Sequence, residues 1–291
     1  MKRASKKKLP KEKVLEAKGL PYEHLRFLVD NYYMSQEMRK RMDMQKRHAG
    51  DKEIDEASAK LFDKIRDSFA DIEEEIKGLL GAYAKGNVAN WLRAQRGIGP
   101  VIAAGLLGHI DITKAPTAGS IWRFAGLDPS CKWEKGKKRP YNAALKQLAW
   151  HIGQSFMKLS NDPDCMYGQL YRERKQYEIE RNESGGNAEL AKSFVTSSAD
   201  VKAKLKEGKL PASVIDARAR RYAVKIFLSH LHYIWFFDHF GRTAPLPYAI
   251  EFGSHAHFIQ PSDMKLIPGL PWATRVPCRW SEPLPKRVPN A

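Results

Sequence analysis

Residues Leu92 to Leu107 read LRAQRGIGPVIAAGLL. Residues typical of helices stand on both sides of Gly97-Ile98-Gly99, so the pattern predicts two helices joined by a tight turn. The two glycines permit the sharp turn and let the backbone approach a partner closely, because neither carries a Cβ. Pro100 fits the first turn of the second helix, where its missing N–H would have had no partner.

This turn resembles the helix-hairpin-helix motif of many DNA-binding and repair proteins, with Ile98 filling the space between the helices. The second helix points its first N–H groups outward, where they can bind a phosphate oxygen. The alternative is a tight turn buried inside the protein. We expect DNA contacts from two arginines and from the backbone of the turn: Arg93, Arg96, Gly97, Ile98, Gly99 and Val101.

A densely basic loop follows the hairpin, between residues 128 and 140. Cations beside an exposed aromatic ring suit tracking of a nucleic-acid backbone and stacking on a base or sugar. In the alternative, the loop is an ordinary solvated surface and its indole folds back on the core. The expected nucleic-acid contacts in this loop are Lys132, Trp133, Lys135, Lys137, Lys138 and Arg139.

Two long helices are predicted before the hairpin, the first from Tyr22 to about His48 and the second up to Tyr83, with Asp51 as the N-cap of the second. We expect them to form an antiparallel hairpin over residues 22–86, with an apolar stripe of the second helix packed against the first. A homodimer through residues 54–83 is the alternative use of that stripe. The stripe consists of Ile54, Leu61, Ile65, Ile72, Ile76, Leu79 and Tyr83.

Further helices are predicted at residues 141–159, 166–181 and 211–240, with one or two short ones before Pro211. Two segments, 248–252 and 255–259, hint at short strands in a proline-rich tail. No run of alternating strands and helices occurs, so the predicted class is all-α. The predicted domains are a basic N-terminal arm (1–21), a long helical hairpin (22–86), a helix-hairpin-helix DNA-binding domain (87–241) and an irregular tail rich in proline and aromatic residues (242–291).

The chain carries 50 Lys and Arg against 33 Asp and Glu, a formal net charge of +17. A field of this sign favours polyanions, with nucleic acid ahead of an anionic membrane. The three cysteines, Cys131, Cys165 and Cys278, are odd in number and far apart, which excludes a CxxC zinc pair and favours the reducing cytoplasm. No apolar run reaches membrane-spanning length, so we expect no membrane partner.

The order of parts from residue 88 to residue 240 resembles the C-terminal domain of the IS110/IS116/IS902 transposase family. After the Gly97-Ile98-Gly99 turn come the segment FAGLDPS (residues 124–130), the basic loop, a helix starting near Tyr141 and a terminal helix over 218–237. The resemblance implies the DNA-handling half of a recombinase. In that family a RuvC-like nuclease domain precedes this domain, and a loop serine, usually in a Ser-Gly pair, is used in catalysis.

The sequence departs from the family pattern at both catalytic parts. Its N-terminal region reads as long helices, with no strand to display metal-binding carboxylates, and Lys135-Gly136 stands at the expected Ser-Gly place. Ser130 is the nearby hydroxyl nucleophile and therefore the one candidate catalytic residue. We predict a protein that binds the backbone of duplex or branched DNA in transposition or recombination and is not catalytic by itself. The alternatives are a serine-dependent recombinase with a nuclease subunit in trans and a structural helical assembly protein.

No cofactor and no metal site are predicted. His230 and His232 stand two residues apart in a helix and point to nearly opposite sides, so they do not easily share a metal. His255 and His257 would need Asp238 and His239 for a metal site, and ordinary polar contacts are the default. The aromatic residues of the last helix are expected in the core rather than in a base-stacking platform: Tyr222, Phe227, Tyr233, Trp235, Phe236, Phe237 and Phe240.

Overall fold

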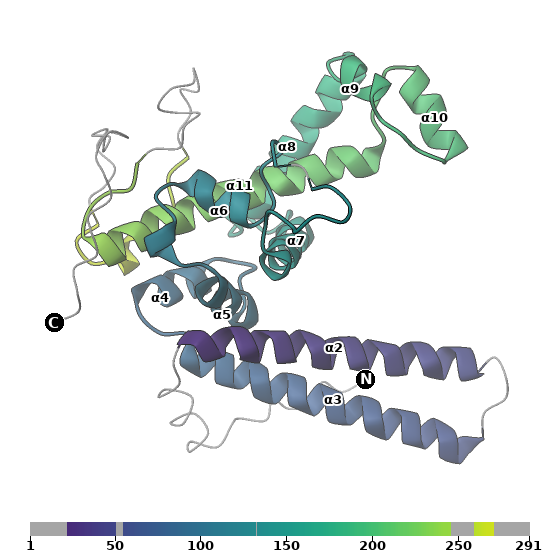
Figure 1. The fold of residues 1–291 in the computed structure, drawn as a ribbon, viewed down its shortest axis with the longest axis vertical. Coiled ribbons are helices and arrows are strands. Elements are labelled where there is room, and N and C mark those ends of the chain that lie inside the picture. The colour runs from purple at the N-terminus through teal and green to yellow at the C-terminus, as the bar shows by residue number, and fades with distance from the viewer. Residues whose placement is uncertain (1–21, 51–54, 132, 246–258, 271–291) are drawn as a thin grey trace. The chain divides into compact units, whose positions relative to one another are not determined.

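The computed structural model describes residues 22–50, 55–131, 133–245 and 259–270. These residues form ten α-helices and two short 3-10 helices, without a β-strand among them, which confirms the all-α class (Figure 1). None of the helices in these ranges is long and apolar enough to cross a membrane. The basic arm, Asp51, Lys132, most of the tail and nearly all of the two segments that hint at strands lie outside the described residues.

The chain divides into two compact units. Unit 1 holds the described residues up to Arg93 together with Gly99–Asp111, and unit 2 holds Ala94–Ile98 and the described residues from Ile112 onward. The sequence predicts a boundary between residues 86 and 87. In the structure, the helices on both sides of the Gly97 turn pack with unit 1, whereas the turn itself packs with unit 2. The chain therefore crosses between the units more than once.

Two long helices, α2 (Tyr22–Gly50) and α3 (Glu56–Tyr83), dominate unit 1 (Figure 1). The N-cap of α3 is Asp55, whose carboxylate accepts bonds from the Ser58 N–H at 2.9 Å and from the Ser58 hydroxyl at 2.7 Å. These bonds lower the pKa of Asp55. The helix begins later than an Asp51 cap would place it, because Asp55 satisfies the exposed N–H groups at this point.

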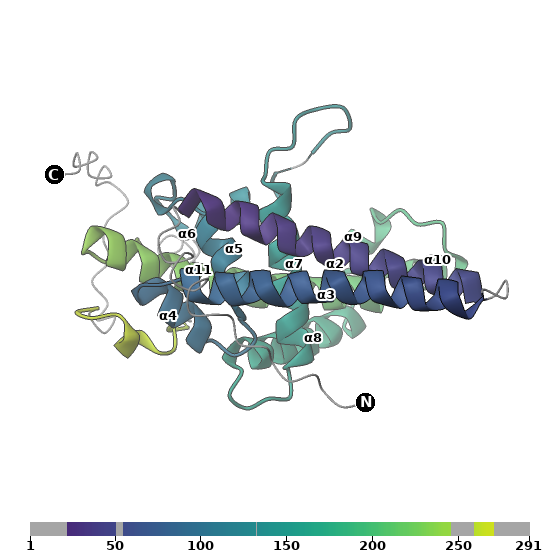
Figure 2. The same cartoon turned by 90° about the horizontal axis from the view of Figure 1, so that it is seen from below.

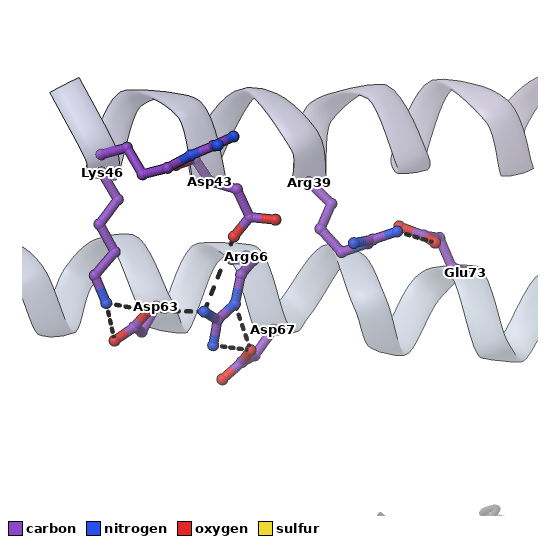
Figure 3. Close-up of polar contacts among 8 residues, drawn as sticks. Arg39, Asp43, Lys46, Asp63, Arg66, Asp67 and Glu73 are labelled. Atoms are coloured by element: carbon purple, nitrogen blue, oxygen red, sulfur yellow. Dashed lines mark hydrogen bonds and ion pairs between the residues drawn. The ribbon is translucent and has the colours of Figure 1, made fainter. Parts of the chain in front are cut away.

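Polar contacts join residues 39–46 of α2 to residues 63–73 of α3, as Figure 3 shows. Arg39 Nε lies 2.6 Å from Glu73 Oε1, and Lys46 Nζ lies 2.7 Å from both carboxylate oxygens of Asp63. Arg66 adds an ion pair to Asp63 at 3.0 Å within α3. Residue numbers on α3 fall as those on α2 rise, so the two helices run in opposite directions.

The middle of the apolar stripe of α3 is exposed to solvent, contrary to the preferred interpretation of the sequence, whereas Tyr83 at its end is buried. Leu61, Ile65 and Ile72 are 57%, 37% and 42% exposed. The positions of α3 that meet α2 include Asp63 and Glu73 instead. A periodic stripe shows that one face of a helix is apolar, but it does not show which neighbour covers that face. Here the interhelical ion pairs go with a rotation of α3 that turns Leu61, Ile65 and Ile72 outward.

Two shorter helices complete unit 1, α4 (Asn87–Ala94) and α5 (Pro100–His109). Nearly every side chain of α5 is buried, and this helix packs against both α2 and α3. Gly108 permits the close approach to α2, because a Cβ at that position would lie 3.1 Å from the backbone nitrogen of Arg26. Arg26 in turn donates to the Gly108 carbonyl at 3.1 Å. The largest fully buried side chains here are Trp91, Leu25, Leu80, Leu92 and Leu106.

Unit 2 is built around α11 (Ala212–Phe240), against which α6 (Ala118–Phe124), α7 (Ala143–Lys158) and α8 (Met166–Glu183) pack. The predicted start and end of α11 are confirmed, with Pro211 as its N-cap and Gly241 in the left-handed conformation just past its end. Two short helices, α9 (Ala188–Lys192) and α10 (Ala199–Lys206), occupy the polar stretch before α11, as predicted.

An aromatic cluster forms the centre of unit 2. The ring centroids of Phe156 and Tyr167 are 5.0 Å apart. The ring centroid of Phe227 lies 5.5 Å from that of Phe156 and 5.1 Å from that of Tyr167. Tyr167 Oη and His230 Nδ1 are 2.9 Å apart, and His230 Nε2 lies 2.8 Å from the Ile259 carbonyl. This carbonyl can only accept, so His230 donates from Nε2 and accepts at Nδ1 from the tyrosine. The buried polar groups of the cluster are therefore satisfied.

Of the aromatic residues of α11 that the sequence places in the core, Phe227 and Phe236 are buried. The other five are half-buried, and one of them, Tyr222, stacks against the guanidinium of Arg174 at 4.8 Å. The same arginine pairs at 2.6 Å with Glu178, whose carboxylate is nearly fully buried. The α8–α11 contact thus combines apolar packing with charges that are paired where they are buried.

Candidate nucleic-acid interface

The turn of the hairpin is held against α7 by backbone contacts of Gly97. The Gly97 φ angle is +91°, a backbone conformation that residues with a side chain rarely adopt. A Cβ there would also lie 2.9 Å from Ser155 Oγ. The Ser155 hydroxyl donates to the Gly97 carbonyl at 2.7 Å. Ile98 is buried, as expected for the residue between the glycines. Gly97 therefore has a structural reason for being glycine that requires no ligand.

Gly99 has neither of these constraints. Its φ angle of −84° is open to any residue, and a Cβ there would meet no atom within 4 Å. It is the N-cap of α5 and makes no side-chain cap, while Pro100 occupies the first turn. The bond from the Ala103 N–H to the Gly99 carbonyl, at 3.0 Å, is the first intrahelical bond of α5. The N–H of Val101 comes before it in the chain and is therefore one of the helix-start N–H groups that have no partner within the helix. This exposed start of α5 is the part of the hairpin open to a ligand; the Val101 side chain itself is buried.

The two arginines of the hairpin already have partners within the chain. Arg93 donates to the Gly81 carbonyl at 3.2 Å and to Asn90 Oδ1 at 2.8 Å. Gly81 lies in the last turn of α3, where carbonyls lack intrahelical partners, so Arg93 caps that helix. Arg96 pairs with Asp162 at 3.1 Å, although its side chain stays largely exposed. Both cations would have to exchange an intrachain contact for a phosphate.

The basic loop is exposed from residue 133 to residue 140, and Figure 2 shows it extending away from the helices of unit 2. The indole of Trp133 is 43% exposed, so it does not fold back on the core. Its Nε1 donates to the Lys137 carbonyl at 2.7 Å, and the guanidinium of Arg139 lies 5.4 Å from its ring centroid. Trp133 therefore organises its own loop and holds a cation beside an accessible aromatic face.

The cations of this loop differ in how far they are neutralised. Lys137 pairs with Glu134 at 2.7 Å. Lys135 and Lys138 are exposed and have no acidic partner in the part of the chain that the structure describes. With Arg139, they present three positive charges on one short loop, which is the arrangement that phosphate groups favour. The sixth expected residue, Lys132, lies outside the described residues.

Ser130 lies in a tight turn rather than in a catalytic arrangement. Its N–H and its hydroxyl both donate to Asp128 Oδ1, at 2.9 Å and 2.7 Å. Bonds from an aspartate to the second residue after it are typical of an Asx turn. They also lower the pKa of Asp128, which keeps this carboxylate ionised and makes it a weak base. The contacts of Ser130 are accounted for by the shape of the loop.

The base of the loop is tied to α11 through Trp122 and Lys225. Trp122 Nε1 donates to the Lys225 carbonyl at 3.0 Å, and Lys225 Nζ lies 4.8 Å from the Trp122 ring centroid. Burial lowers the pKa of Lys225, while the nearby charge of Asp128 opposes this effect. The loop therefore begins from a fixed point on the core of unit 2.

Sequence reasoning missed Trp150, which is 57% exposed on α7. Lys146 stands one turn before it, with Nζ 4.2 Å from the ring centroid of Tyr141. A tyrosine, a cation and a tryptophan thus follow one another from the end of the basic loop along the first turns of α7. The buried positions of α7 repeat with helical spacing and exclude residue 150, a signal that the sequence contained: Leu145, Leu148, Ala149, Ile152, Gly153 and Phe156.

The histidines of α11 bind separate carbonyls. His230 bonds Tyr167 and Ile259, whereas His232 Nε2 lies 2.8 Å from the Ala115 carbonyl. Burial lowers the pKa of each of these two imidazoles to about 4. Among the described residues, no group of three or more His, Cys, Asp and Glu side chains could hold a metal ion. The segment with His255 and His257 lies outside those residues.

No protein-family model matches this chain, and the searches of curated proteins and of solved structures likewise found no match.

Proposed function

We propose that this protein binds the phosphate backbone of duplex or branched DNA, mainly through the basic loop and the first turns of α7. The observation that carries the proposal is the conformation of the loop, in which the Trp133 indole bonds the Lys137 carbonyl and lies beside Arg139, while Lys135, Lys138 and Arg139 are exposed. Exposed cations supply salt-dependent affinity for phosphate, and accessible aromatic faces stack on bases that leave the duplex.

The hairpin supplies a second, smaller contact in this proposal. The exposed N-terminus of α5, at Gly99 and Val101, offers backbone N–H groups to one phosphate, as in a helix-hairpin-helix motif. Arg93 and Arg96 contribute less than the sequence suggests, because each already bonds an oxygen of the chain. Such contacts position DNA without reading its sequence.

The setting we infer is transposition or recombination, as the resemblance to the transposase family implies. In this setting the chain is the component that binds DNA. The contacts of Ser130 favour a turn and give no support to a serine nucleophile.

The loop is tested by measuring affinity for duplex DNA as a function of salt concentration. The variant Lys135→Ala/Lys138→Ala/Arg139→Ala removes three exposed cations, and Lys202→Ala/Lys204→Ala/Lys206→Ala on α10 removes the same charge elsewhere in unit 2. We expect the loop variant to make the slope of log K against log salt shallower by about 2 to 3, since each phosphate contact contributes about 0.9. Equal effects of the two variants, or no binding by the parent at low salt, would overturn the proposal.

The hairpin contact is tested separately at Gly99. Aspartate and asparagine are both good N-caps, and a side chain at this position meets open space, so neither substitution should weaken α5. Gly99→Asp places a negative charge where the phosphate would bind and is expected to lower DNA affinity several-fold relative to Gly99→Asn. Indistinguishable affinities of the two variants would remove the hairpin from the interface while leaving the loop in place.

A further inference from the structure

The two-helix arm formed by α2 and α3 leaves a row of large apolar side chains in solvent. On α2 these are Phe27, Met34 and Met38, and on α3 they are Leu61, Ile65 and Ile72, all of them classed as exposed. Within each helix, consecutive members are seven and four residues apart, so each set lies on one side of its helix. Scattered apolar residues on a surface are ordinary, whereas aligned rows on adjacent helices indicate a contact surface.

The two rows lie on the same side of the arm. Arg39 and Lys46 mark the direction in which α2 faces α3, and Asp63 and Glu73 mark the direction in which α3 faces α2. Each residue of a helix is turned by about 100° from the one before it. Counted in this way around each helix axis, the apolar row of α2 and that of α3 are both rotated in the same sense from the positions that contact the other helix. Because the helices run in opposite directions, equal rotations bring both rows to one face of the pair. We call this face the apolar arm face.

The other side of the arm is the one that α5 covers. Gly108 of α5 approaches the backbone of Arg26, and Gly81 of α3 approaches Pro100. A Cβ added at these glycines would lie 3.1 Å from Arg26 N and 3.6 Å from Pro100 Cβ. By the same helical count, these positions of α2 and α3 stand opposite the apolar arm face. The fold of unit 1 therefore uses one side of the arm and leaves the apolar side without a cover.

The charge of the arm indicates what covers this face. Basic side chains outnumber acidic ones on α2, whereas acidic side chains outnumber basic ones on α3. Within one chain, this difference already joins the helices through Arg39–Glu73 and Lys46–Asp63 (Figure 3). A second copy placed face to face about a twofold axis can set α2 of each chain across α3 of the other. It then repeats the same complementarity while burying both apolar rows.

We propose that two copies of this chain associate through the apolar arm face to form an antiparallel four-helix bundle. A twofold contact is self-complementary, so each row of one copy also serves as the cover for the other copy. Methionine at two of the six positions helps the surfaces fit, because its flexible side chain fills irregular gaps. Two-helix hairpins that pair in this way bury a shared core of the kind found in four-helix bundles.

The oligomeric state of the full chain tests the proposal. The mass of the parent protein is measured by sedimentation equilibrium over a range of concentrations, beside Leu61→Gln/Ile72→Gln and Met44→Gln. Met44 is a matched control, because it is also exposed on the arm but lies off the apolar face by the helical count. We expect a dimeric parent and a dimeric Met44→Gln variant, whereas each substitution on the apolar arm face should weaken dimer association by at least about tenfold.

Circular dichroism of each variant at low concentration separates dissociation from unfolding. The substituted side chains are exposed in the single chain, so helix content should be unchanged. A parent that stays monomeric at about 100 µM would overturn the proposal, since a monomer would mean that any partner for this face is a different protein. A dimer equally stable in the parent and in Leu61→Gln/Ile72→Gln would overturn it as well. DNA binding is a separate measurement, and its outcome does not affect this one.

Discussion

The α2–α3 arm and the core of unit 2 are both helical, but different forces hold them together. The helices of unit 2 meet through fully buried rings such as Phe156 and Phe227. In the outer part of the arm the helices meet through ion pairs, and apolar residues such as Leu61 stay in solvent, whereas Leu25 and Leu80 are buried near the other end of the arm. Apolar burial supplies most of the stability of a fold, whereas ion pairs near the surface supply little. Unit 2 thus buries its apolar residues within its own core, whereas the arm leaves exposed the apolar face to which we assign a second copy of the chain.

The largest effect should come from the centre of unit 2. Phe227→Ala removes a ring that packs against both Phe156 and Tyr167, and it should lower the free energy of unfolding by about 3–5 kcal/mol. Phe27→Ala is the matched change on the arm, and because that ring is exposed in the single chain, it should cost far less under dilute, monomeric conditions. Urea unfolding of the two variants measures both values. Similar losses would contradict the contrast between the regions.

Mild acid should weaken unit 2 through its two buried histidines. Burial lowers the pKa of His230 and His232 from 6.5 to about 4, so the unfolded chain binds more protons than the folded chain between these values. Stability is therefore complete above about pH 6.5 and is lost as the pH falls toward 4, by about 1–2 kcal/mol per histidine at pH 5. Thermal unfolding between pH 7 and pH 5 checks this. His232→Gln should flatten the dependence, and an unchanged slope would exclude His232 as its source.

The smallest effects should come from the ion pairs of the arm, and these should differ from one another. Glu73 is buried, so Arg39→Met leaves its carboxylate without a partner and should cost about 1–2 kcal/mol. Lys46 and Asp63 are both more than a third exposed, so Lys46→Met should change stability little. Chemical unfolding of the two variants distinguishes these cases. A larger loss from Lys46→Met would show that the outer part of the arm depends on its surface charges.

Local signals predicted the helices well. The all-α class, both ends of α11 and the short helices before it follow from periodicity, proline and glycine positions, and polar composition. The first residue of α3 is harder to predict from the sequence, because Asp51 and Asp55 are both suitable N-cap residues. The structure shows that Ser58 bonds to Asp55. Helix ends depend on a few hydrogen bonds, which is why neighbouring residues of the same type compete for the role.

Tertiary contacts were not predictable from these signals. The stripe on α3 was visible, but its direction depends on where Arg39 and Glu73 meet. The cations of the loop and the hairpin look alike in the sequence. They differ in the structure because Arg93 and Arg96 find oxygens of the chain, whereas Lys135 and Lys138 find none among the described residues. Trp150 could have been noticed, since it falls outside the buried positions of α7.

The short segment Ala94–Ile98 has a practical consequence for cutting the molecule into pieces. It packs with unit 2, but the chain on both sides of it packs with unit 1. A truncation that begins at Ile112 would remove the residues that accept from Ser155 and pair with Asp162, and it would leave those side chains without their contacts. A truncation that ends at Asp111 would expose the turn instead. The two units therefore cannot be expressed separately by choosing a single junction, and fragments intended to isolate one function need Ala94–Ile98 supplied with unit 2.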